Sequence, residues 1–202
     1  MTSILTPAKK DIEAVVCLCH GYMDNASFFK RHEYIRLVNR GIALVTIEYQ
    51  GHGRSDGELV YLPSWEDNIQ DVVSYFRQTV NESFASKPCF LMGESMGGAI
   101  SFDVYDRSRN ISDLNWKGVI LCSPMCKISE EIMPPPFVLR LFEFLLGPLG
   151  SETWLGHLPI APSGTMNGFK LAHRRQLAQC VPTWPGCRKP RLATARELIV
   201  SN

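Results

Sequence analysis

The sequence predicts an α/β fold with a mostly parallel sheet flanked by helices, and three observations lead to this expectation. The apolar runs are short and continuous rather than alternating, as in strands covered on both faces. Stretches with helical apolar spacing separate one run from the next. A strand–turn–helix pattern occupies residues 90–100. Strands and helices that alternate in this way favour a parallel sheet with right-handed crossovers.

Length, charge and cysteine content narrow the class of protein. A chain of 202 residues is long enough for one α/β domain, and its net charge of +1 gives no reason to expect nucleic acid as a partner. Of the seven cysteines, four lie in apolar strand-like runs, so we expect reduced thiols and a cytoplasmic location. No signal peptide is evident, and residues 137–149 are too few to span a bilayer.

The first half of the chain supplies two strands and two helices. Residues 14–19 form a continuous apolar run that predicts a buried strand, and a helix follows with Phe28, Ile35 and Val38 on one face. Gly41 ends that helix, and residues 43–47 predict the second strand.

A glycine-dense turn at residues 50–57 comes next, and no regular element would tolerate it. Ser64 and Asp67 then have the spacing of a capping box, which opens a helix. Its apolar stripe is Trp65, Ile69, Val72, Val73, Phe76 and Val80.

The most informative stretch is the Gly-Glu-Ser-Met-Gly run at residues 93–97, a G-x-S-x-G nucleophile elbow. A serine raised on so tight a turn needs small residues two positions away on either side, which Gly93 and Gly97 provide. An apolar strand at residues 89–92 precedes the turn, and a helical pattern at 98–105 follows. Ser95 is therefore the candidate nucleophile.

The last third of the chain predicts a fourth buried strand at residues 118–122, after which the alternation of strands and helices stops. Prolines divide residues 125–187 into short helices, which we interpret as a helical cap over a core of residues 14–124, after a lead of residues 1–13. Within the cap, residues 137–146 form a helical segment that is apolar on most of its circumference. This predicts packing inside the cap, with a lipid-facing lid as the less favoured alternative. Residues 188–202 begin a helix that returns to the core.

Four motifs in order resemble one known family. They are His20-Gly21, the glycine-rich residues 51–57, the elbow and its following glycine at 93–98, and residues 123–128. Together they resemble the α/β-hydrolases of the monoacylglycerol lipase-like branch, of serine aminopeptidase S33 type. That branch includes lysophospholipases and plant caffeoylshikimate esterase-type enzymes. The likeness covers about residues 14–199 and implies an α/β-hydrolase fold with a helical cap.

The resemblance also implies a site. Ser95 would be the nucleophile, and the backbone N–H groups of Tyr22 and Met96 would form the oxyanion hole. His20, Gly21, Gly93 and Gly97 would support the turns, with His52 a turn-stabilising side chain. The family needs no metal or organic cofactor. A small ester or monoacyl lipid would be the substrate, and the cap would offer peripheral contact with a membrane.

The chain departs from the family pattern at both ends. The family's catalytic acid and histidine follow strands later than Asn202, so we expect a chain truncated before both. The remaining histidines (His32, His157, His173) and the acids Asp103 and Asp106 do not have the order of a substitute triad.

We also expect a sheet that is incomplete at both ends, with the Ala43 and Gly118 strands as its edges. Two functions remain open. One is a serine ester hydrolase working through an acyl-serine intermediate, weakly active or inactive as this chain alone. The other is a non-catalytic binding or regulatory protein that lacks the triad acid and base.

Overall fold

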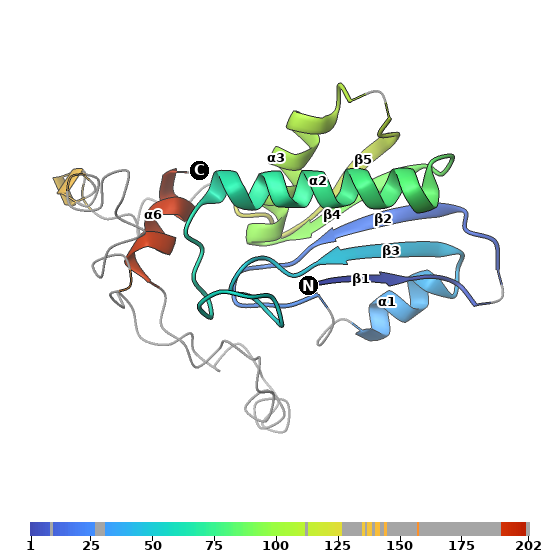
Figure 1. The fold of residues 1–202 in the computed structure, drawn as a ribbon, viewed down its shortest axis with the longest axis horizontal. Helices are drawn as coiled ribbons and strands as arrows, with labels where there is room; N and C mark the ends of the chain where they lie inside the picture. Colours follow the sequence, from blue (N-terminus) through green and yellow to red (C-terminus); the bar gives the residue numbers. More distant parts are fainter. Residues whose placement is uncertain are drawn as a thin grey trace. The chain divides into compact units, whose positions relative to one another are not determined.

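A computed structural model describes residues 1–8, 10–26, 31–111, 113–126, 135, 137–138, 140–141, 144, 157 and 191–200 (Figure 1). The chain divides into two compact units. The first combines Met1–Tyr49 with Ile69–Cys126, and the second combines Gln50–Asn68 with Lys127–Asn202. The expected cap falls mostly outside the described residues and stays a prediction, as does the division into core and cap.

A five-stranded sheet in the order β1-β3-β2-β4-β5 forms the first unit. Figure 1 shows the strands in this order, from β5 at the top to β1 at the bottom. The strands are β1 (Thr2–Leu5), β2 (Ala14–Cys19), β3 (Ile42–Ile47), β4 (Cys89–Glu94) and β5 (Trp116–Cys122). All neighbours are parallel except β1, which runs antiparallel to β3. The predicted α/β fold and mostly parallel sheet are confirmed.

Helices cover both faces of this sheet. On one face, Val16, Leu18 and Leu44 form a buried cluster with Tyr34 of α1 (Arg31–Val38). Side chains alternate between faces along a strand, so Val15, Cys17 and Leu91 point the other way, and they are fully buried. Helix α3 (Met96–Ser108) lies on that second face, because a Cβ at Gly93 would lie 2.4 Å from its Ser101 Oγ.

The expectation that the Ala43 strand is an edge is wrong. Strand β1 pairs with β3 from Thr2↔Ile47 to Leu5↔Leu44, and it hides the backbone groups that β3 would otherwise expose. Four residues are too few to show the alternation that predicts a strand, which is why the sequence did not identify β1. Strand β5 does lie at an edge of the sheet, as far as the described residues go.

The helix after the glycine-rich turn has the predicted start. Helix α2 spans Trp65–Phe84, and the Ser64 hydroxyl accepts a hydrogen bond from the Asp67 backbone N–H at 3.1 Å, so Ser64 is its N-cap. The side chains of Ile69, Val72 and Phe76 are fully buried, as their spacing predicts. The expected position of Phe28 lies outside the described residues.

The second unit joins the turn after β3 to α6 (Leu192–Val200). The Thr194 hydroxyl accepts a hydrogen bond from the Leu62 N–H at 2.9 Å, and a Glu197 carboxylate oxygen accepts one from the Trp65 N–H at 2.8 Å. Trp65 is the first residue of α2, so this carboxylate lies where the helix dipole favours negative charge. Helix α6 lies within residues 188–202, where the sequence predicts a helix, and the return of that helix to the core stays a prediction.

Candidate active site

The carboxyl ends of β2, β4 and β5 meet around Ser95. The register pairs Cys19 with Gly93 and Glu94 with Cys122, so the turns that follow these three strands are neighbours. The Ser95 N–H donates to the Cys122 carbonyl at 3.1 Å, and its carbonyl accepts from the Met125 N–H at 2.9 Å. The Ser95 backbone is therefore held on both sides by the chain that leaves β5.

Backbone strain is concentrated at these same strand ends. Among the described residues other than glycine, four have positive φ, and three of them follow β2, β4 and β5: Met23 (60°), Ser95 (53°) and Ser123 (45°). Such conformations cost about 1–3 kcal/mol each and persist only where the surrounding structure imposes them. Strain of this kind clusters at active sites, so it marks this end of the sheet as the candidate site.

Ser95 lies between β4 and α3 with its side chain on the surface. The residue is exposed, whereas Met96, Gly97 and Gly98 behind it are buried. It occupies the N-cap position of α3, yet its hydroxyl makes no capping hydrogen bond, and no other hydrogen bond to it is found within the described part of the chain. The Ser95 hydroxyl is therefore not engaged in capping the helix that it precedes.

The glycines of the turn allow a very close approach of β2, β4 and α3. A Cβ at Gly93 would lie 2.0 Å from the Gly97 carbonyl oxygen, and one at Gly97 would lie 2.1 Å from the Cys19 carbonyl oxygen. Neither position accommodates a methyl group, since real Cβ atoms essentially never come within 3.0 Å of such neighbours. The backbone here thus requires glycine at both positions.

The His20-Gly21 turn lies directly beside the serine. A Cβ at Gly21 would be 3.5 Å from the Ser95 Cβ and 3.3 Å from the Glu94 carbonyl oxygen. His20 is buried, and its Nδ1 lies 2.9 Å from the Gly21 carbonyl oxygen, so it is a structural part of this turn. The residues from Gly21 to Tyr22 are therefore within reach of a group bound at Ser95.

The Cys19 thiol offers no rival nucleophile. Its side chain is 2% exposed, and burial raises its pKa to about 11, so it is a neutral thiol at neutral pH. Burial likewise raises the pKa of Cys17 well above the usual range. Cys17, Cys19, Cys89, Cys122 and Cys126 are free cysteines, while Cys180 and Cys187 lie outside the described residues.

The other titratable residues considered from the sequence lie in contacts of their own. His157 bonds Glu58 through Nδ1 at 2.6 Å and stacks on Tyr61, and Arg191 also bonds Glu58. Asp106 pairs with Arg109 at 3.1 Å. The His32 side chain and His173 lie outside the described residues. Within those residues, no group of three or more His, Cys, Asp or Glu side chains could hold a metal ion.

His52 has a buried position in the turn of the second unit. Its side chain is fully buried, its Nδ1 lies 3.0 Å from the Gln50 carbonyl oxygen, and burial lowers its pKa below the ordinary value of 6.5. Gly51 of the same turn has φ of 70°, and a Cβ there would lie 2.3 Å from the Glu58 carbonyl oxygen. The burial of His52 and the close approach of the Glu58 carbonyl to Gly51 restrict the conformations that this loop can adopt.

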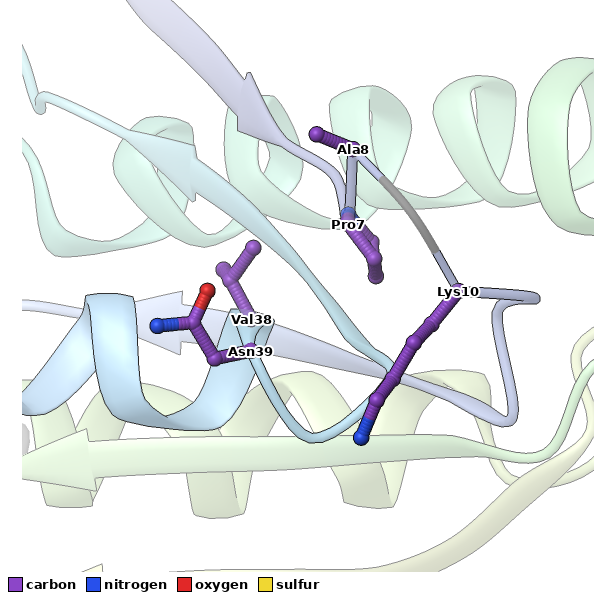
Figure 2. A pocket seen from close by; sticks show the side chains of 5 residues that line it. All are labelled: Pro7, Ala8, Lys10, Val38 and Asn39. Atoms are coloured by element: carbon purple, nitrogen blue, oxygen red, sulfur yellow. The ribbon is translucent and has the colours of Figure 1, made fainter.

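A separate pocket lies at the opposite end of the sheet. Figure 2 shows its lining residues, Pro7, Ala8 and Lys10 before β2 and Val38 and Asn39 at the end of α1. Its volume is about 360 Å³. These residues precede β2 and β3, whereas ligands of open parallel sheets bind at the carboxyl ends of the strands. The pocket is therefore not the site around Ser95.

Comparison with known proteins identifies the family of this chain. The family model described as serine aminopeptidase, S33, matches residues 10–183. The chain belongs to this family. Across 202 residues it is 27% identical to caffeoylshikimate esterase of Arabidopsis thaliana, covering 98% of this chain and 58% of that protein. It is 32% identical to the monoacylglycerol lipase of Mycolicibacterium smegmatis over 124 residues, covering 61% of this chain and 42% of the relative.

Solved structures of other proteins share the fold. The monoglyceride lipase of Saccharomyces cerevisiae, crystallised as a soluble variant with a substrate analogue, matches 99% of this chain and 63% of its own with a TM-score of 0.71 at 16% identity. A carboxyl esterase from Bacillus coagulans with bound glycerol gives a TM-score of 0.72, again at 16% identity, covering 99% and 66%. The α/β-hydrolase fold is thereby confirmed, and this chain spans little more than half of the esterase from Arabidopsis.

Proposed function

We propose that this chain carries the nucleophile and oxyanion hole of a serine ester hydrolase that cleaves monoacylglycerol, lysophospholipid or similar carboxylic esters. The observation that supports this most directly is the strained, exposed Ser95 between β4 and α3, with the Gly21 turn against it. The elbow is the arrangement in which an α/β-hydrolase presents its serine. Relatives named as monoacylglycerol lipase and caffeoylshikimate esterase favour ester substrates.

In the proposed reaction, the Ser95 oxygen attacks the ester carbonyl carbon. As the new C–O bond forms, the carbonyl π electrons move to the carbonyl oxygen. The N–H groups of Tyr22 and Met96 would stabilise the negative charge on that oxygen by donating hydrogen bonds to it. Losing one such donor costs about 2.7–4 kcal/mol in a hydrolase where this was measured. The intermediate then expels the alcohol, which takes up the proton from Ser95. Water attacks the acyl-serine to release the acid and restore the hydroxyl.

The proton of Ser95 needs a general base for full activity. No described histidine hydrogen-bonds to Ser95, so the expected activity of this chain alone is low. In hydrolases from which triad members have been removed, the oxyanion hole and substrate binding alone still accelerate the reaction about 10³–10⁴-fold over the rate in water. The proposed chain would therefore show slow acylation rather than none.

Acyl transfer to Ser95 tests the proposal. The chain is incubated with p-nitrophenyl butyrate, quenched in acid and digested, and the acylated peptide is located by mass spectrometry. We expect one acyl group on Ser95, and no acylation in Ser95→Ala. Acylation at another residue, or equal p-nitrophenol release by Ser95→Ala, would contradict the proposal. Tight binding of a monoacylglycerol without any acyl-serine would instead favour the non-catalytic binding protein.

A further inference from the structure

The orientation of the Gly21–Tyr22 peptide determines where the Tyr22 N–H, a donor of the proposed oxyanion hole, points. The Gly21–Tyr22 peptide is trans, as are all peptide bonds of the described chain, so its C=O and N–H point in opposite directions. The Gly21 carbonyl oxygen accepts two hydrogen bonds, from the Asp24 N–H at 3.2 Å and from His20 Nδ1 at 2.9 Å. Whatever holds this carbonyl therefore also directs the Tyr22 N–H.

The contacts of His20 require one tautomer. A carbonyl oxygen only accepts, so Nδ1 must carry the proton that it shares with Gly21. The Tyr49 backbone N–H donates to Nε2 at 3.4 Å, so Nε2 must be unprotonated. The ring is then neutral with its proton on Nδ1, and it connects the end of β3 to the Gly21 carbonyl.

Tyr49 contacts His20 in three independent ways. Besides the backbone N–H, its hydroxyl donates to the His20 carbonyl oxygen at 3.2 Å, and the two rings stack with centroids 4.0 Å apart and planes 30° from parallel. Tyr49 is 2% exposed, and burial raises its pKa well above the ordinary value, so its hydroxyl stays protonated and able to donate. The histidine ring and the start of the turn are both held by one residue.

We propose that Tyr49 is a positioning residue of the oxyanion hole: it holds His20 as the Nδ1–H tautomer, and His20 in turn orients the Gly21–Tyr22 peptide toward Ser95. The proposal rests on the function proposed above. The sequence did not single out Tyr49, because it is 29 positions from His20 and belongs to no motif.

Two variants of Tyr49 separate positioning from core packing. Tyr49→Leu removes both the stack and the hydroxyl, while Tyr49→Phe keeps the stack. Phe76→Leu, at a fully buried aromatic of α2, is the matched control for loss of a ring from the core. The full-length chain is used throughout, and a thermal melt confirms that each variant is folded at the assay temperature.

The first readout is the rate at which a fluorophosphonate probe modifies Ser95, with Ser95→Ala as the blank. An oxyanion donor acts on the chemical step, so Tyr49→Leu should lower the maximal rate about tenfold or more and leave the half-saturating probe concentration unchanged. The maximal rate of Tyr49→Phe should stay within about threefold of the wild-type rate, and that of Phe76→Leu should equal the wild-type rate. Equal maximal rates for Tyr49→Leu and Phe76→Leu would overturn the proposal while leaving the function intact.

The second readout does not depend on catalysis. Tyr49→Leu keeps the backbone N–H that donates to Nε2 but loses the stack that holds the ring against it. Nitrogen-15 NMR of the histidine rings, assigned with His20→Asn, should therefore show His20 protonated on Nδ1 in wild type and in Phe76→Leu, and a mixture of tautomers in Tyr49→Leu. If the probe fails to modify wild-type Ser95, the proposed function fails and this spectrum alone decides the role of Tyr49. An Nε2-protonated His20 in wild type, or an unchanged spectrum in Tyr49→Leu, would overturn it.

Discussion

Ser95 carries a conformation that its own side chain disfavours. With φ of 53° and ψ of −122°, it lies where residues with a Cβ are strained and glycine is not. Its backbone is held by hydrogen bonds to Cys122 and Met125, so the strain cannot relax by a local shift of the turn. Position 95 is thus one where the demands of the site and of stability oppose each other.

Replacing Ser95 by glycine should therefore stabilise the fold relative to Ser95→Ala. Both variants lack the hydroxyl, so their difference isolates the backbone. Relief of about 1–3 kcal/mol of strain, less about 0.5–1 kcal/mol for the greater freedom of unfolded glycine, leaves Ser95→Gly more stable by about 1 kcal/mol. Urea unfolding of the two variants measures this. A lower free energy of unfolding for Ser95→Gly would show that the turn is not strained.

His52 makes stability depend on pH. Burial lowers its pKa in the folded chain below 6.5, so the unfolded chain binds the proton more readily. Its contribution is fully present above about pH 6.5 and is lost as the pH falls below that value, by at most about 1.4 kcal/mol per pH unit. His52→Asn should therefore lose less stability than wild type between about pH 7.5 and pH 5.5. Equal losses in urea unfolding would contradict this assignment.

At the scale of elements, Thr194 connects α6 to the turn before α2. It is fully buried, and its hydroxyl is the acceptor for the Leu62 N–H. Thr194→Val preserves shape but leaves that buried N–H without its acceptor, which should lower the free energy of unfolding by about 1–3 kcal/mol. Thr194→Ser keeps the hydroxyl and should recover most of the loss. Equal unfolding midpoints for the two variants would mean that this hydrogen bond contributes little.

The elements that the sequence predicted well are those with a local signal. The continuous run at Ala14–Cys19 matches β2, and the stripe beginning at Trp65 matches the buried side of α2. Contacts between distant positions carry no such signal. Glu197 lies 132 positions from the Trp65 N–H that it bonds, and β1 owes its place to pairing with β3 rather than to its own four residues.

The candidate site divides in the same way. Ser95 and its glycines follow from a motif, because the turn they form is sterically possible only with those residue types. The roles of Tyr22 and Met96 came from family resemblance and stay predictions. Tyr49 could not be found from sequence at all, since its three contacts with His20 exist only once β2 and β3 are paired.

At the scale of the whole chain, the described residues show no helix that is long and apolar enough to cross a membrane. The first unit carries exposed apolar side chains on both its sheet and a helix. Ile120 and Leu121 of β5 are 44% and 40% exposed, and Phe102 of α3 is 59% exposed. On the side away from β4, β5 pairs with no described strand.

We expect this edge to cause self-association through strand pairing. The wild-type chain should elute from size exclusion as larger species as its concentration rises, because β5 combines exposed backbone groups with apolar side chains. Ile120→Lys should shift elution toward monomer, since a charged side chain on an edge strand opposes pairing. Phe102→Lys removes comparable apolar surface from a helix and should leave association nearly unchanged. A wild-type chain that stays monomeric would contradict the expected self-association. Equal effects of the two lysine substitutions would show that the β5 edge is not its cause.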